Sequence, residues 1–260
     1  TPVPPVTADI RPDDPLLAEQ VAYYRARAGE YDAWWLRQGR FDRGAEFNAA
    51  WFAEVADVER TLRAWLAAAR PRRALELACG TGLFTRHLAP EVGSLTAIDA
   101  SPEVIARNRA RLAALGIANV TFVEADLFAW RPDARYDLVF MSFWLSHVPV
   151  DRFDAFWSTL REALAPGAAV YLIDSAHDPT STAVDHVLTG TGVVTRKLDD
   201  GSTYRIVKHF WTPGRLADAL ARLGFRASIA QTPRYFIHGE ARPGSRLRGP
   251  ARGRRRSGSW

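Results

Sequence analysis

Two glycines and an acidic residue lie where an apolar segment gives way to a helical pattern, in the run Glu76-Leu77-Ala78-Cys79-Gly80-Thr81-Gly82. Gly80 and Gly82 carry no side chain, so a nucleotide-like ligand can lie close against the backbone of the turn. A dinucleotide site would have the pattern G-x-G-x-x-G, but Ala78 replaces the first glycine and no third glycine follows at the required spacing. Glu76 is poorly placed for a pyrophosphate and favours a cationic ligand, an ammonium or a sulfonium.

Acidic residues also follow the next two predicted strands. Asp99 lies about 20 residues beyond Gly80, the spacing at which a carboxylate accepts hydrogen bonds from ribose hydroxyls. Asp126 can accept a hydrogen bond from an exocyclic adenine amine, and Leu127 can cover the ring. Because the carboxyl ends of parallel strands meet at one edge of a sheet, these residues indicate one nucleoside site.

Residues 72–175 resemble the core of the class I S-adenosylmethionine-dependent methyltransferases, whose first motif is an acidic residue followed by glycines of this kind. The resemblance implies S-adenosyl-L-methionine as cofactor, S-adenosyl-L-homocysteine as product and a small-molecule methyl acceptor. The implied cofactor contacts are Glu76, Ala78, Gly80 and Gly82 at the methionine moiety, Asp99 at the ribose, Ala100, Ser101, Asp126 and Leu127 at the adenine, and Ser142 after the fourth predicted strand.

The segment Arg27-Ala28-Gly29-Glu30-Tyr31-Asp32 resembles the part that closes over the cofactor in small-molecule members of this family. Arg27 and Tyr31 lie four residues apart, on one face of a helix. The resemblance implies that Arg27 holds the cofactor's carboxylate and that Tyr31 packs beside the methyl donor. An amphipathic helix docked on the sheet explains the same pattern.

A methyl acceptor must approach the segment after the fourth predicted strand, residues 141–149. Methyl transfer from a sulfonium is an in-line displacement, so its rate depends mainly on how the acceptor is held. A base is needed only where the acceptor keeps its proton, and His147 is the candidate catalytic base because histidine has an ordinary pKa of about 6.5. The alternative is that His147 packs or orients the loop.

Aromatic and basic residues are the candidate substrate contacts, although core packing and a solvated strand face explain them as well. The candidates are Tyr24, Trp34, Trp35, Trp144, His209 and Trp211, and the basic residues of a predicted hairpin, Arg196, Lys197, Arg205 and Lys208, for an anionic acceptor. The histidine spacing fits no metal motif and Cys79 is the single cysteine, so we expect no metal site.

The apolar pattern predicts the elements that position these groups. Helical periodicity covers residues 16–37, with an interruption near Gly29, and residues 46–69. Predicted strands then alternate with helices, and Ser101 and Pro102 have the cap and first-turn chemistry of a helix start. The strands are expected at 74–77, 95–98, 120–123, 136–141 and 168–173. This alternation predicts an α/β fold with a Rossmann-like doubly wound sheet, mostly parallel with an antiparallel last strand.

The last third of the chain has a different pattern. Strands at 193–197 and 203–210 flank Asp199-Asp200-Gly201, a good hairpin turn, and a helix at 213–223 precedes strands at 225–229 and 234–238. We expect a single domain at 16–240. Its parts are a helical lid (16–70), the cofactor-binding core (72–175) and a substrate-side hairpin with C-terminal strands (176–240). An extended N-terminal arm (1–15) precedes the domain.

The net charge of +5 belongs to the C-terminal tail, because seven of the 34 Lys and Arg residues follow Glu240 and no acidic residue does. Residues 241–260 are predicted to be a disordered basic tail. No apolar run is long enough to span a membrane and no secretory signal begins the sequence, so we expect a cytoplasmic protein. The Ala- and Arg-rich composition, with two lysines, is typical of bacteria with high-GC genomes.

Three functions are compatible with these patterns. Small-molecule methylation is favoured, at oxygen because His147 offers a base. Nucleic-acid or protein methylation would use the basic tail, but the expected acceptor motifs are missing after the fourth predicted strand, so we do not expect nucleic acid as a partner. A methyltransferase-like protein that binds the cofactor without transferring its methyl group is the third. Whether the chain is a monomer or a homodimer stays open.

Overall fold

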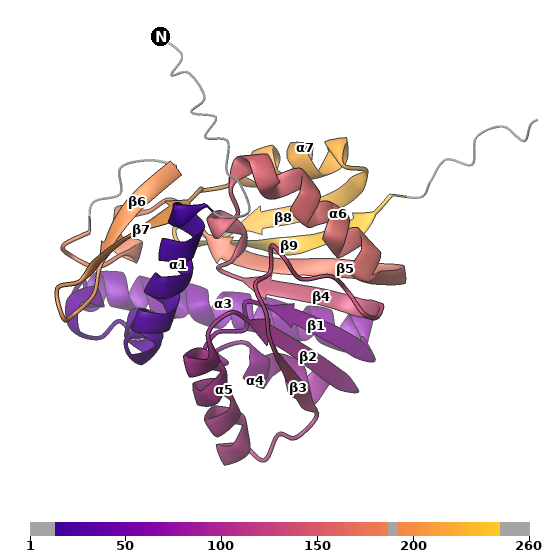
Figure 1. The fold of residues 1–260 in the computed structure, drawn as a ribbon, viewed down its shortest axis with the longest axis horizontal. Coiled ribbons are helices and arrows are strands. Elements are labelled where there is room, and N and C mark those ends of the chain that lie inside the picture. Colours follow the sequence, from indigo (N-terminus) through magenta and orange to yellow (C-terminus); the bar gives the residue numbers. More distant parts are fainter. Residues whose placement is uncertain (1–13, 187–191, 245–260) are drawn as a thin grey trace, which may run out of the picture.

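The computed structural model describes residues 14–186 and 192–244 of the 260-residue chain. A seven-stranded sheet has the strand order β3-β2-β1-β4-β5-β9-β8. Its strands are β1 (Arg73–Leu77), β2 (Ser94–Asp99), β3 (Val120–Glu124), β4 (Tyr136–Ser142), β5 (Leu164–Ser175), β8 (Phe225–Gln231) and β9 (Phe236–Pro243). Strands β1 to β5 pair in parallel, and β9 runs antiparallel to β5 and β8. The predicted mostly parallel sheet with an antiparallel last strand is confirmed (Figure 1).

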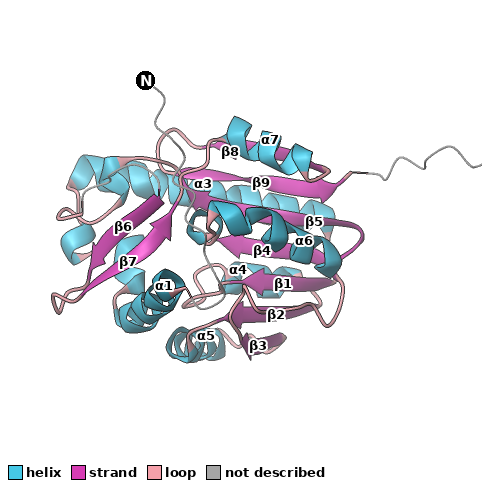
Figure 2. Cartoon of the chain, turned by 45° about the horizontal axis from the view of Figure 1, so that its top comes forward, coloured by secondary structure: helices cyan, strands magenta, loops and turns pink. Residues whose placement is uncertain are grey.

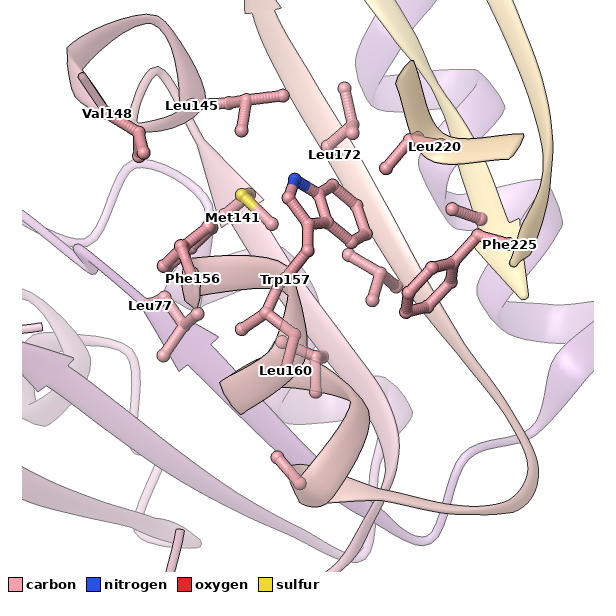
Figure 3. Packing of buried hydrophobic residues seen from close by; sticks show 14 of the residues in the cluster. Leu77, Met141, Leu145, Val148, Phe156, Trp157, Leu160, Leu172, Leu220 and Phe225 are labelled. Atoms are coloured by element: carbon pink, nitrogen blue, oxygen red, sulfur yellow. The ribbon is translucent and has the colours of Figure 1, made fainter. Parts of the chain in front are cut away.

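Helices cover both faces of this sheet (Figure 2). α3 (Ala45–Ala69) and α4 (Thr85–Leu88) bury their apolar residues on one face, and α6 (Phe153–Ala163) and α7 (Pro213–Arg222) bury theirs on the other. Figure 3 shows Trp157 of α6 among Met141, Leu220 and Phe225, residues of β4, α7 and β8. α5 (Pro102–Ala114) contacts β2 and β3, and it begins as predicted, because the Ser101 side chain accepts a hydrogen bond from Val104 N at 3.3 Å.

The long helix α3 is a layer of the fold and not a lid. Trp51, Val58, Leu62 and Leu66 are fully buried, and they share a core cluster with residues of β1, β2 and β4. Glu54 fixes the helix to the connection between β8 and β9, where its carboxylate accepts a hydrogen bond from Tyr235 N at 2.8 Å. The predicted lid at 16–70 was therefore too long, because periodicity alone does not distinguish a helix packed on a sheet from one that crosses a site.

A helix and a hairpin lie beside the carboxyl ends of the parallel strands. α1 (Pro15–Ala26) packs against β7 (Thr203–Lys208), which forms a separate two-stranded sheet with β6 (Gly192–Lys197) (Figure 1). Gln20 joins three segments: its side chain accepts from Val207 N at 2.9 Å and donates to His147 O at 3.3 Å. A short helix, α2 (Tyr31–Trp35), follows the break predicted near Gly29.

Three predicted boundaries were wrong. α1 begins at Pro15, inside the predicted arm, because the Asp14 side chain caps it by accepting from Leu16 N at 2.7 Å. β5 begins at Leu164, four residues before the strand expected at 168–173. β9 extends to Pro243, where a tail was expected, because Ala241 is fully buried between β5 and β8. The remainder of the predicted arm and tail, residues 1–13 and 245–260, lies outside the described residues.

No helix within the described ranges combines the length and the apolar character that crossing a membrane requires.

Candidate functional site

A cavity of about 370 Å³ lies at the carboxyl ends of β1, β2 and β4, where α1 covers it. This is the edge at which open α/β sheets bind nucleotides. Of the predicted cofactor contacts, Tyr31, Ala78, Gly80, Asp99, Ala100, Ser101, Asp126, Leu127 and Ser142 line this cavity. Arg27, Glu76 and Gly82 do not.

Asp99 connects two parts of the cavity wall. One of its carboxylate oxygens accepts a hydrogen bond from Gly80 N at 2.9 Å, and the other accepts from Ser101 N at 3.0 Å. Burial raises the pKa of the Asp99 carboxyl, and these backbone donors oppose the shift. Because each oxygen has a second lone pair and the residue lines the cavity, the carboxylate can still accept hydrogen bonds from ligand hydroxyls.

The two glycines of the turn have different functions. At Gly80, with φ +52°, an added Cβ would lie 3.9 Å from the Tyr31 ring, an ordinary contact, so this glycine keeps the cavity wall open. At Gly82, with φ +87°, a Cβ would lie 2.3 Å from Asn108 Oδ1. Asn108 is fully buried and donates to Thr85 Oγ1 at 2.8 Å, so it has little freedom to move away. Gly82 therefore allows packing of the turn against α5; it does not line the cavity, and its contact with the cofactor stays a prediction.

This difference gives a matched pair of variants. Gly82→Ala is expected to lower the free energy of unfolding by about 2–4 kcal/mol, because both the steric overlap and the positive φ oppose the methyl group. Gly80→Ala should cost about 1 kcal/mol, the cost of left-handed backbone alone. Urea denaturation of both variants measures the two values, and equal losses would contradict the assignment.

Glu76 lies in β1 beneath the turn and not on the cavity wall. It is 1% exposed, and neither of its carboxyl oxygens has a hydrogen-bond partner. Burial raises the pKa of this carboxyl to about 8. The prediction that Glu76 directly faces a cationic ligand is therefore not what the geometry favours; its oxygens are unsatisfied polar atoms directly behind the turn.

The opposite end of the cavity is apolar with one acid. Leu127 is buried, Asp126 is exposed and accepts from Phe128 N at 3.0 Å, and Trp144 packs on Phe128 with ring centroids 5.5 Å apart. Trp144 was predicted to contact the substrate, but it lines this end of the first cavity and not the second cavity described next. A flat heterocycle fits between such walls.

A second cavity, of about 70 Å³, lies between α1, α2 and the β6–β7 hairpin. Four side chains line both cavities: Tyr24, Tyr31, Phe143 and His147. Sequence reasoning missed Phe143, whose φ of +53° is unusual for a residue with a large side chain and turns the chain sharply after β4. The two cavities therefore meet at a shared wall.

His147 is held in one protonation state at this wall. Its Nδ1 lies 2.6 Å from Val207 O, which can only accept, so Nδ1 carries the proton. Nε2 lies 2.7 Å from Tyr24 Oη and accepts its hydrogen. Burial, with the positive charge of Lys208, lowers the pKa of His147 well below its ordinary value, and burial raises the pKa of Tyr24 well above its own. Both groups are therefore neutral near pH 7.

The basic residues of the hairpin divide into two pairs. Arg196 and Lys208 are buried and line the second cavity, whereas Arg205 is exposed and pairs with Glu19 at 2.9 Å. Lys197 also lines the second cavity but is exposed. Arg27, predicted to hold the cofactor's carboxylate, lies with the buried pair in the second cavity.

Three predicted substrate contacts line neither cavity. Trp35 is 3% exposed and packs against Trp51 and Phe84, so its position is structural, and its neighbour Trp34 lines the second cavity instead. Trp211 packs on Phe153 with ring centroids 4.9 Å apart. His209 is fixed by its backbone, which donates to Ser146 O at 2.7 Å. Within the described part of the chain, no group of His, Cys, Asp and Glu is arranged to hold a metal ion.

Several known proteins with similar sequences or structures are named methyltransferases or are solved with SAM or SAH bound. Residues 74–167 match the family model of a methyltransferase domain. The structure of DhpI bound to SAH is 37% identical, with a TM-score of 0.69, over 89% of this chain and 98% of that one. A DhpI-SAM-HEP complex gives a TM-score of 0.70 at the same identity, over 88% and 98%.

Curated relatives match over shorter stretches. Malonyl-[acyl-carrier protein] O-methyltransferase of Paenibacillus sp. (strain JDR-2) is 32% identical over 146 residues, 52% of this chain and 48% of that protein. Trans-aconitate 2-methyltransferase of Rhizobium leguminosarum bv. trifolii (strain WSM2304) is 31% identical over 130 residues, 48% of each. The chain thus spans about half the length of these curated relatives.

The cavity has the residues that the shared cofactor needs. Gly80 leaves the turn open, Asp99 offers a carboxylate to hydroxyls, and Leu127 offers an apolar wall. The similarity to DhpI covers almost all of both chains, so it concerns the whole fold and not one motif. The chain therefore belongs to the class I S-adenosylmethionine-dependent methyltransferase family.

Proposed function

We propose that the chain transfers a methyl group from S-adenosylmethionine to an oxygen atom of a small molecule. The shared wall carries this proposal, because Tyr24, Tyr31, Phe143 and His147 each line both the cofactor cavity and the second cavity. An acceptor in the second cavity would lie directly beside the cofactor. A volume of about 70 Å³ suits a small acceptor or a small group of a larger one.

The first cavity would hold the cofactor through the residues already described. Asp99 would accept hydrogen bonds from the ribose hydroxyls, Asp126 and Leu127 would contact the adenine, and Gly80 and Tyr31 would border the methionine moiety; all five residues line the cavity. When bound, S-adenosylmethionine would supply an electrophilic methyl carbon, which an oxygen lone pair attacks while the sulfonium sulfur leaves as the neutral thioether of S-adenosylhomocysteine. The protein's contribution is to exclude water and to orient the acceptor, which can account for most of such a rate enhancement.

Oxygen is favoured as the acceptor atom by the polar groups on the shared wall. The Tyr24 hydroxyl gives its hydrogen to His147, so its own oxygen can accept a hydrogen bond from a hydroxyl group of the acceptor molecule. His147 is a poor base here, because its one free lone pair is already used and a second charge would lie near Lys208. We therefore assign His147 as the positioning residue that orients Tyr24.

A screen with labelled methyl donor tests the proposal. Small alcohols and acids are incubated with the protein, and label is expected in a product whose new bond is an ether or an ester. Deleting residues 245–260 should leave turnover unchanged; the cut follows β9, which ends at Pro243. Label in nitrogen or carbon positions only, or in RNA or protein and lost with the tail, would refute oxygen methylation of a small molecule.

The Tyr24–His147 pair gives a kinetic prediction. Tyr24→Phe and His147→Asn should each lower kcat by roughly tenfold with little change in KM for the cofactor, and the double variant should be no worse than either single variant, since the residues act as a unit. The kcat of the wild type should show no inflection near pH 6.5, because His147 stays neutral. An inflection there that His147→Asn removes would make His147 a general base.

A further inference from the structure

Three buried or half-buried cationic side chains from separate segments of the chain line the second cavity, beside the exposed Lys197. Arg196 of β6 is 8% exposed and Lys208 of β7 is 6% exposed, and Arg27 follows directly after α1 and is half-buried. A buried cation costs several kcal/mol unless an anion or hydrogen-bond acceptors offset the loss of water. The partners of these three groups therefore decide what the cavity can hold.

Lys208 has only partial compensation. Its Nζ donates to Ser146 Oγ at 2.8 Å and to Ser175 Oγ at 3.3 Å, and it lies 3.9 Å from Asp174 Oδ1. The Asp174 oxygens already accept the backbone N–H groups of Ser146, at 2.9 Å, and Ser175, at 2.7 Å. One carboxylate, beyond direct hydrogen-bond distance, is the anion that the chain offers to Lys208.

The positive charges of the two arginines are compensated even less than that of Lys208. Arg196 Nη1 is buried and has no hydrogen-bond partner. The Arg27 guanidinium lies over the rings of Tyr23, Tyr31 and Phe41, at 5.6, 5.0 and 5.8 Å from their centres. Ring contacts use the faces of a guanidinium and leave its in-plane N–H donors for another partner. Neither arginine forms an ion pair among the described residues.

The cationic side chains of the second cavity are not balanced by anionic groups. Burial lowers the pKa of Lys208 to about 8; Asp174 opposes this shift, while Arg196 and Arg27 add to it. Burial likewise lowers the pKa of His186, another lining residue, to about 4, so this ring adds no charge near pH 7. Each cation therefore disfavours the others until an anion lies among them.

We propose that Arg27, Arg196 and Lys208 bind a doubly charged, phosphate-like oxyanion group of the methyl acceptor. Three cations against the one carboxylate of Asp174 leave two positive charges, and the planar fork of an arginine matches two oxygens of such a group. Because the inference names the class of acceptor, it rests on the proposed function.

Two other features fit this assignment. Glu30 and Lys197, which also line the cavity, carry opposite charges and leave the balance unchanged. The shared wall residues Tyr24 and His147 place the oxyanion next to the cofactor cavity. An oxyanion does not need a base to remove its proton, which agrees with a His147 that is neutral and hydrogen-bonded at both ring nitrogens.

Titration calorimetry at pH 7.5 with the protein saturated by S-adenosylhomocysteine tests the proposal. Inorganic phosphate is the probe, and acetate is the singly charged comparison. Phosphate is expected to bind saturably and at least tenfold more tightly than acetate. Arg196→Met should weaken phosphate binding by roughly 30-fold or more, since a buried charge partner is lost. The matched control is Arg205→Met, an exposed cation of the same hairpin, which should leave phosphate binding unchanged.

The homocysteine product also serves as the folding control. Arg196→Met that still binds S-adenosylhomocysteine is folded, and Arg196→Lys should recover part of the phosphate affinity. Unchanged phosphate binding in Arg196→Met, equal losses in Arg205→Met, or equal affinity for acetate would overturn the proposal. If phosphate binds as expected but no oxygen acceptor is methylated, the proposed function fails while the anion site stands; if oxygen is methylated but phosphate does not bind, only the anion site fails.

Discussion

Asp99→Ala is expected to remove most of the thermal stabilisation that S-adenosylhomocysteine gives the wild-type protein. A ligand at about 100 times its dissociation constant stabilises the folded state by roughly 2.7 kcal/mol. The variant loses a carboxylate that lines the cavity, and hydrogen bonds to a charged group contribute about 1.5–3 kcal/mol each. Two lost bonds to the ribose weaken binding by 100-fold or more, which leaves about 0.4 kcal/mol of stabilisation at the same ligand concentration.

Two controls separate ligand contact from local disruption. Asp99 also holds Gly80 N and Ser101 N, so Asp99→Asn, whose amide oxygen can keep one of these bonds, should retain more stability without ligand than Asp99→Ala. Asp126→Ala removes an exposed acid at the opposite end of the cavity and should lower the affinity for S-adenosylhomocysteine by tenfold or less. NAD is the ligand control. A full shift with Asp99→Ala would refute the assignment of this carboxylate to the ribose, and a shift with NAD would refute the cavity's preference for S-adenosylhomocysteine over a dinucleotide.

The cofactor cavity was predictable from the sequence because its parts are local. A strand, a turn with glycines and the first residue after the next strand follow one another along the chain, and parallel strands bring their carboxyl ends together. Ser101 and Pro102 mark a helix start by their own chemistry, and the structure shows that cap. Gly82 is the exception, because its neighbour Asn108 lies on a different helix and no local pattern reports this contact.

The second cavity was not predictable to the same degree, because it depends on contacts between distant segments. α1 crosses the β6–β7 hairpin, which lies about 180 residues later, and Gln20 joins the hairpin to the loop of His147. From the sequence, a solvated strand face explained Arg196 and Lys208 as well as a substrate contact did. Alternation along β6 holds a signal, since Val194, two residues before Arg196 on the same face, is buried; β7 buries Ile206, Val207 and Lys208 in succession and shows no such alternation. Such a pattern predicts which face of the strand is buried, but it does not predict which segment of the chain packs against that face.

Glu76→Gln is expected to remove a pH dependence from the stability of the ligand-free protein. The folded-state pKa of Glu76 is raised to about 8, so the folded protein keeps a proton that the unfolded chain releases near pH 4.5. The contribution of Glu76 to the free energy of unfolding should therefore be largest below about pH 4.5. It should fall as the pH rises from there to about 8, where the folded protein also loses the proton. Each pKa unit corresponds to about 1.4 kcal/mol, so the loss across this window is several kcal/mol.

Urea denaturation at several pH values between 5 and 9 measures this loss. Glu76→Gln places an uncharged amide of the same shape at a site that is 1% exposed, so its stability should change less with pH and exceed that of the wild type at pH 8.5. Glu124→Gln, in the exposed last residue of β3, should follow the wild-type profile. If the wild type were instead as stable at pH 9 as at pH 5 and Glu76→Gln were destabilising throughout, the carboxylate would have to be ionised and paired in the folded state.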